Sequence, residues 1–139
     1  MAHNRMVFDG LAELRRQLRN LPPDLTAEAQ RITEDAANRA AARIRASYPR
    51  RSGALVGGVT VTHFEGGKFF AGAILKNRSP HAAIFEVGTQ TRKTDLGANR
   101  GSMPPGNVFV PIAIQERRQM YEDLKDLVDS NGFTVRGNV

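Results

Sequence analysis

Residues 25–49 read LTAEAQRITEDAANRAAARIRASYP, and this stretch decides the fold. Its apolar residues recur every three or four positions, which is the spacing of one face of an α-helix. Pro49 ends the pattern, because proline has no N–H to give to the helical ladder. We therefore predict a helix from about residue 25 to residue 48, capped by Asp24 or Thr26. Its apolar stripe is rich in alanine, so another element can approach it closely: Leu25, Ala29, Ile32, Ala36, Ala40, Ile44 and Tyr48.

A shorter helix is predicted before this one. Four leucines between residues 11 and 21 have spacings of three, four and three, with Asp9 as a plausible N-cap. Pro22 and Pro23 follow and end that helix.

A β-hairpin is predicted after the long helix. Residues 59–64 alternate in character and are β-branched, Gly66–Gly67 suits a two-residue turn, and residues 69–75 return. The turn at Gly66–Gly67 sets the register of the two strands. In that register one face of the hairpin points toward the core, since side chains alternate along a strand. The expected core face consists of Val59, Val61, Phe70 and Ile74.

The last third of the chain combines two predicted helices with a long loop. Residues 79–88 have the signals of a short helix, with Ser79 as cap, Pro80 at the first position and Gly88 ending it in the left-handed conformation. Residues 88–107 contain four glycines and two prolines, which predicts a long loop that is flexible or becomes ordered on assembly. A final helix is expected over residues 111–130, ended by Asn131–Gly132, with an edge strand over residues 133–135. Its expected stripe is Ile114, Tyr121, Leu124 and Val128.

These elements predict one α+β domain spanning residues 1–139. The long N-terminal helix and the C-terminal helix are expected to pack on one face of a small antiparallel sheet. No internal repeat and no second domain is evident in the sequence.

Composition excludes several classes of function. The 139 residues include no cysteine and three histidines, so thiolate chemistry and cysteine-ligated metals are absent. The histidines lack metalloprotease spacing, and the chain has no phosphate-binding or nucleotide-binding glycine motif. We therefore expect no catalytic residue, no metal, no cofactor and no enzymatic activity. No apolar run is long enough to span a membrane, and residues 1–10 do not form a signal peptide.

Most of the net charge of +6 lies in two short segments. Residues 49–56 carry a net charge of +2, and residues 88–107 carry another +2. Such segments either contact a polyanion or only keep surface loops soluble. The candidate channel or interface residues are Arg50, Arg51, Arg92, Lys93 and Arg100.

Four motifs, in order, resemble the neck or tail-completion proteins of long-tailed double-stranded DNA phages. They are residues 10–14 (GLAEL) before the long helix, 48–55 (YPRRSGAL), 80–89 (PHAAIFEVGT) and 103–113 (MPPGNVFVPIA). Ser52 stands where the family commonly has threonine, and His81 stands where it commonly has tyrosine. The candidate structural residues within these motifs are Ser52, Gly53, Phe85, Glu86, Gly88 and Phe109.

The resemblance implies a structural virion protein of the tail or neck, assembled in the host cytoplasm. It implies a homo-oligomeric ring, a hexamer or else a dodecamer, at the head-to-tail junction. The expected partners are the connector or head-completion protein, the tail tube protein and the DNA that passes through, which is contacted transiently and without sequence preference. The sequence also leaves open a small basic nucleic-acid-binding protein of a mobile element. A toxin-like or nuclease-accessory enzyme is disfavoured by the missing catalytic residues.

Overall fold

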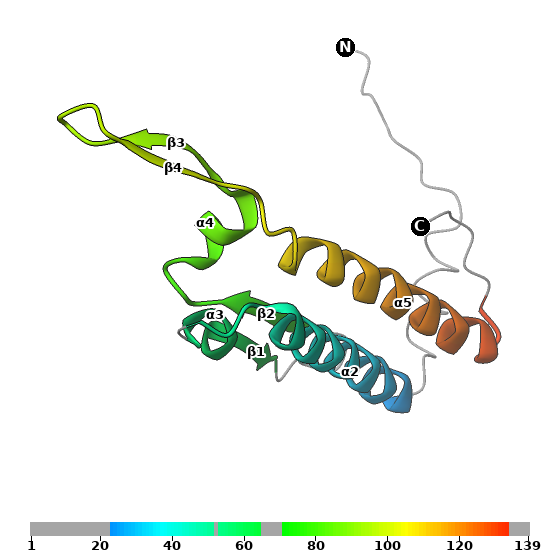
Figure 1. The fold of residues 1–139 in the computed structure, drawn as a ribbon. Helices are drawn as coiled ribbons and strands as arrows, with labels where there is room; N and C mark the ends of the chain where they lie inside the picture. The colour runs from blue at the N-terminus through cyan, green and yellow to red at the C-terminus, as the bar shows by residue number, and fades with distance from the viewer. Residues whose placement is uncertain (1–22, 52, 65–70, 134–139) are drawn as a thin grey trace, which may run out of the picture.

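The computed structural model describes residues 23–51, 53–64 and 71–133. The predicted helix over residues 11–21 and most of the predicted C-terminal strand lie outside these residues. Figure 1 shows two long helices, two separate two-stranded sheets and two short helices. In chain order the elements are α2 (Pro23–Ser47), α3 (Ala54–Gly58), β1 (Val59–His63), β2 (Ala73–Asn77), α4 (Ala82–Val87), β3 (Thr89–Lys93), β4 (Asn99–Met103) and α5 (Phe109–Ser130).

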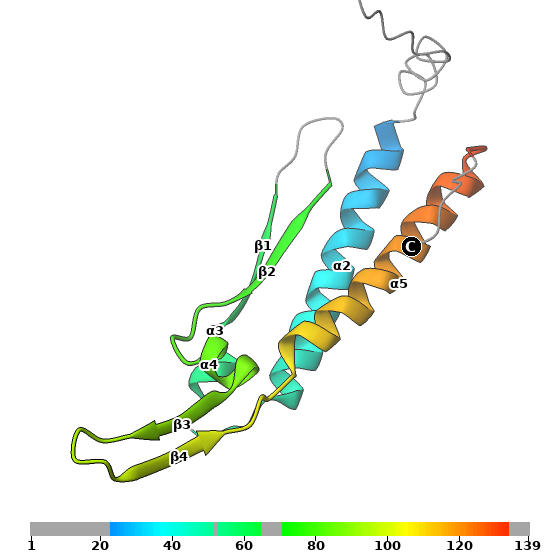
Figure 2. The same ribbon diagram turned by 90° about the horizontal axis from the view of Figure 1, so that it is seen from above.

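Helix α2 is the centre of the molecule. The β1–β2 hairpin lies along one side of α2 and α5 packs against another side, as Figure 2 shows. The predicted stripe of α2 is confirmed where the core is deepest, because Ala36, Ala40, Ile44 and Tyr48 are all buried. Residues from α3, β1, β2, α4 and α5 close over this core. The α+β class is therefore confirmed, with the two long helices packed together beside small antiparallel sheets.

The β1–β2 hairpin forms, but its predicted register is wrong. A two-residue turn at Gly66–Gly67 would place Val59 opposite Ile74, whereas Val59 pairs with Asn77. A shift of three residues exchanges the two faces of the returning strand. Ile74 is therefore 42% exposed, and Leu75 packs against the core instead. The predicted turn and Phe70 lie outside the described residues.

Asn77 explains why the strands end in this register. Its side-chain amide donates to the carbonyl oxygen of Leu55 (3.0 Å) and to the hydroxyl of Tyr48 (3.3 Å), and its oxygen accepts from the backbone N–H of Ser79 (2.9 Å). The side chain fills the space beside Gly58, where an added Cβ would lie 2.2 Å from its oxygen. These bonds fix β2 against α3 and the end of α2.

Helix α4 is shorter than predicted. It begins at Ala82 with His81 in the N-cap position, so Ser79 and Pro80 lie in the preceding turn. The hydroxyl of Ser79 accepts a long bond of 3.4 Å from the N–H of His81. Gly88 ends α4 at the predicted position, but its conformation is not the predicted left-handed one, because φ is 80° and ψ is −173°.

The region expected to be a structureless loop contains a second hairpin. β3 and β4 pair antiparallel, with Thr89 opposite Met103, and project away from the helices (Figures 1 and 2). We call residues 89–103 the arm. The sequence did not predict its strands, because they are polar and contain no alternating apolar residues.

Helix α5 begins at Phe109, two residues earlier than predicted, and ends before Asn131 as expected. One predicted stripe residue is wrong, since Ile114 is 45% exposed. Ile112 and Glu116 face inward in its place.

Candidate functional site

Glu86 of α4 caps the N-terminus of α5. One carboxylate oxygen accepts the backbone N–H groups of Val108 (3.1 Å) and Phe109 (3.0 Å), and the other accepts that of Val110 (2.9 Å). The fourth residue of this first turn is Pro111, which has no N–H. A helix normally begins with four backbone N–H groups that have no partner within the helix. In α5 the carboxylate of Glu86 accepts three of them, and the fourth position is a proline without an N–H.

The pKa of Glu86 reports this arrangement. Partial burial acts to raise the pKa, but the three backbone N–H groups favour the ionised form more strongly, so that the pKa lies below its ordinary value. A carboxylate at a helix N-terminus is also stabilised by the helix dipole. Glu86 is thus a negatively charged structural cap.

Two glycines let the chain cross closely over α4, and we call this junction of α4, the arm and the start of α5 the arm root. A Cβ at Gly88 would lie 2.6 Å from the carbonyl oxygen of Met103. A Cβ at Gly106 would lie 2.3 Å from the ring of Phe85, and the Gly106 N–H donates to the Phe85 carbonyl (2.8 Å). The Phe85 ring in turn meets Tyr48 edge-on, with centroids 5.6 Å apart.

The structural residues predicted from two of the motifs therefore meet at the arm root. Phe85, Glu86 and Gly88 come from α4 and its end, and Phe109 comes from the first turn of α5. Phe85 and Phe109 both pack against the core. The sequence could not show that Glu86 caps α5, because its partners lie 22 to 24 residues farther along the chain.

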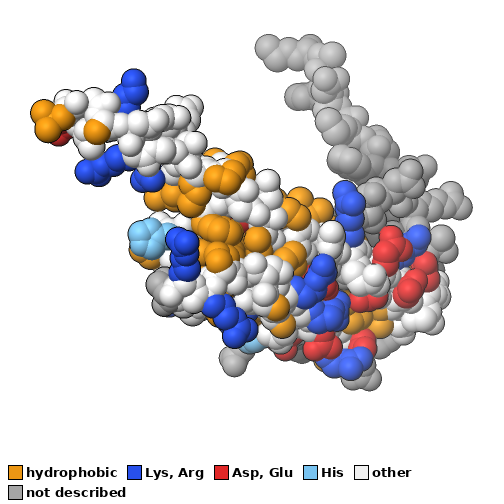
Figure 3. Space-filling view, viewed as in Figure 1, with side chains coloured by type: hydrophobic (Ala, Val, Ile, Leu, Met, Phe, Trp, Pro, Cys, Tyr) orange, Lys and Arg blue, Asp and Glu red, His pale blue; other side chains and the backbone are white. Residues whose placement is uncertain are grey.

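The arm carries three of the predicted cationic residues. Arg92, Lys93 and Arg100 are exposed, and none of them makes an ion pair with a described residue. At the tip, Leu96 is 97% exposed, and Gly97 turns the chain with a φ of 79°. Figure 3 shows the cations on the projecting arm and apolar side chains over the arm root.

The second cationic segment lies between α2 and α3. Arg50 and Arg51 are exposed in the connection between α2 and α3. Gly53 adopts a φ of 71° at the start of α3, while Ser52 lies outside the described residues.

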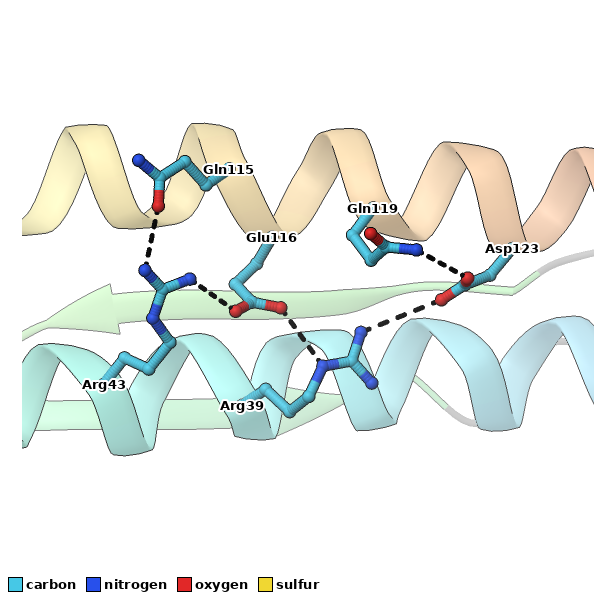
Figure 4. A network of polar contacts seen from close by, with 6 residues as sticks. All are labelled: Arg39, Arg43, Gln115, Glu116, Gln119 and Asp123. Carbon is cyan, nitrogen blue, oxygen red and sulfur yellow. Dashed lines mark hydrogen bonds and ion pairs between the residues drawn. The ribbon is translucent and has the colours of Figure 1, made fainter.

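A charged network between α2 and α5 was missed by the sequence analysis. Glu116 is 9% exposed and accepts from Arg39 Nε (3.1 Å) and Arg43 Nη1 (2.7 Å), as Figure 4 shows. Gln115 and Asp123 extend the network at the two arginines. Burial acts to raise the pKa of Glu116, but the two guanidinium groups outweigh it and lower the pKa. The signal in the sequence is an arginine pair four residues apart on one helix and a carboxylate on the inward face of another.

The described residues contain no cluster suited to a metal ion and no helix suited to crossing a membrane. Among them, no group of three or more histidine, aspartate or glutamate side chains could hold a metal ion. No helix within residues 23–133 as described is long and apolar enough to cross a membrane. An open groove of about 380 Å³ lies between β2 and α5, floored by alanines of α2.

Comparison with known families gives one match. The family described as "Bacteriophage HK97-gp10, putative tail-component" matches residues 12–93, which is more than half of the chain. The chain belongs to this family. The matched residues run from before α2 into β3 and include Glu86, whereas α5 follows them. The family is a structural class of bacteriophage tail components, and its place is the virion tail.

No curated protein and no solved structure matches the chain.

Proposed function

We propose that this protein is a ring-forming subunit at the junction between the phage head and tail. Copies of the chain form a closed homo-oligomer that joins the connector or head-completion protein to the tail tube. The genome passes through the ring, and its phosphates meet only weak cationic contacts. The ring is a neck or tail-completion component of the virion, assembled in the host cytoplasm.

The observation that carries this proposal is the projecting arm. The arm extends from the helices and finds no extensive packing against any other described element. An isolated two-stranded hairpin is marginally stable in water. Such an arm is typical of a subunit that is completed by a neighbour.

The charge distribution supports weak DNA contact around a channel. Arg50 and Arg51 are exposed, and repeating them around a ring would line a path for phosphates without a tight site. A tight site would oppose movement of the genome.

The test is to mix the purified chain with tail tubes of the phage that encodes it. Electron microscopy should show a ring at one end of each tube, and light scattering should give the number of subunits. The full chain should be measured at low and moderate salt, because ring contacts between charged groups weaken as salt rises. Tubes whose ends stay bare at both salt concentrations would contradict the proposal.

The same preparation distinguishes the ring subunit from the alternative of a small nucleic-acid-binding protein. A nucleic-acid-binding protein would ignore the tubes and retard duplex DNA with a steep dependence on salt. A ring subunit should cap tubes without DNA.

A further inference from the structure

The arm has the composition of a protein-docking element. Its tip presents Leu96, which is 97% exposed, beside Asp95. An apolar residue and a carboxylate at the most accessible point do not suit phosphate binding. They suit a protein surface that covers the leucine, with the cations on the strands providing orientation.

Helix α5 carries the opposite charge on its second half. Glu122, Asp126 and Asp129 are exposed and spaced by four and three residues, which places them on one face of the helix. The first half of α5 has no exposed carboxylate among its described residues and includes Arg117 and Arg118. Figure 3 shows Asp and Glu side chains, with Lys and Arg among them, at the end of the molecule that is farther from the arm.

These two surfaces cannot meet within one subunit. The arm root is at the start of α5, and about 17 residues of helix, or about 25 Å at 1.5 Å per residue, separate it from residue 126. The arm also projects in the other direction (Figure 1). A contact between them therefore requires two copies of the chain.

We propose that the arm of one subunit docks on the acidic second half of α5 in the next copy of this chain. This inference rests on the proposed ring and names its interface. The contact is heterologous, because one surface of each subunit meets a different surface of its neighbour. When each copy repeats this contact, the assembly grows in one direction. It closes into a ring when the rotation between neighbouring subunits returns the last copy to the first. Leu96 is covered by the neighbour, and Arg92, Lys93 and Arg100 face its carboxylates.

A disulfide test reads this contact directly, because the natural chain has no cysteine. The full-length variant L96C/D126C should give a ladder of linked multimers under mild oxidation. The control variant L96C/K76C places its second cysteine at an exposed position of β2 and should give at least fivefold less of them. L96C alone should give dimers at most. Equal ladders in the first two variants would overturn the docking site.

Charge reversal gives an independent measurement. R92E/K93E/R100E and E122K/D126K should each weaken self-association at least tenfold in light scattering, whereas the control K76E/R78E should resemble the natural chain. Mixing the two reversed variants should restore assembly, because each then offers a surface complementary to the other. If changing Arg92, Lys93 and Arg100 to serine leaves assembly unaltered, the docking is wrong. Capping of tail tubes by the natural chain remains the separate test of the proposed function.

Discussion

At the scale of the residue, Glu86 links parts of the chain that the sequence keeps apart. Its carboxylate accepts the backbone N–H groups at the start of α5, while its backbone belongs to α4. The arm leaves and returns between these two points, so the position of the arm root depends on this one side chain. Gly88 and Gly106 permit the close crossing that brings the two helices together.

Replacing Glu86 should destabilise the protein. Glu86→Ala should cost about 2 kcal/mol, because a helix cap and charge-assisted hydrogen bonds are lost together. Glu86→Gln should cost about half of that, since its neutral oxygen still accepts a bond. Urea unfolding measures both, with the exposed Glu122→Gln as the matched control. An unchanged unfolding midpoint for Glu86→Ala would show that the cap has no energetic weight.

Two glycines with positive φ, Gly88 at the arm root and Gly97 in the turn at the arm tip, can be compared. Gly88→Ala and Gly97→Ala both place a side chain at positive φ, which costs at least about 1 kcal/mol, and the ψ of −173° at Gly88 is a conformation that almost only glycine adopts. Only Gly88→Ala also drives a Cβ against backbone atoms, at 2.6 Å and 2.8 Å. Gly88→Ala should therefore lower the free energy of unfolding by at least about 1 kcal/mol more than Gly97→Ala. Equal effects in urea titrations would mean that the arm root adjusts freely.

At the scale of the element, the accuracy of the sequence analysis followed the strength of the apolar pattern. Helix α2 could be predicted because its stripe runs over six turns and Pro49 ends it. The register of β1–β2 could not, because the bonds of Asn77 to Tyr48 and Leu55 are tertiary. The strands of the arm bury almost nothing, so they left no periodic signal. In the site, the end of α4 at Gly88 was predictable from local signals, but the conformation of Gly88 and the partners of Glu86 depend on the chain that crosses over α4.

The contact between α2 and α5 should depend on Glu116 and on pH. Glu116→Ala should cost about 2 kcal/mol, which is below the value for a fully buried pair because Arg39 and Arg43 are each nearly half exposed. Glu122→Ala changes an exposed carboxylate of the same helix and is the control. A midpoint shift no larger than that of the control would contradict the assignment.

Acid should weaken the natural protein through both glutamates. Their folded pKa values lie below the ordinary 4.5, so their contribution is present above that pH and is lost as the pH falls through the folded values. The double variant E86Q/E116Q should lose less stability than the natural chain when the pH drops from 6 to about 3. If the urea midpoints of the double variant and of the natural chain fall by the same amount over this pH range, the prediction is wrong.

At the scale of the whole molecule, the fold divides into a packed body and an arm. The body consists of α2, the β1–β2 hairpin, α3, α4 and α5 around one core, and the arm projects from it. This division separates stability from assembly. Changes in the core of the body should alter unfolding, whereas changes in the arm or on the acidic face of α5 should alter association.

Removing the arm should leave the body folded. Residues 90–102 can be replaced by Asn-Gly, because Thr89 and Met103 are paired and a two-residue turn joins paired strands. The shortened chain should keep its free energy of unfolding within about 1 kcal/mol, since the arm buries little outside itself. It should neither self-associate nor cap tail tubes. A shortened chain that still forms rings would assign assembly to another surface.

The three bonds of Glu86 also determine how the molecule responds to a pull. Tension applied at the tip of the arm reaches the body at both ends of the segment between Glu86 and Val108. The bonds to Val108, Phe109 and Val110 all end on one carboxylate, so displacing this side chain releases all three N–H groups at once. A subunit held by its arm would therefore resist extension until this junction fails as a unit, and only then would α5 begin to unwind from its first turn.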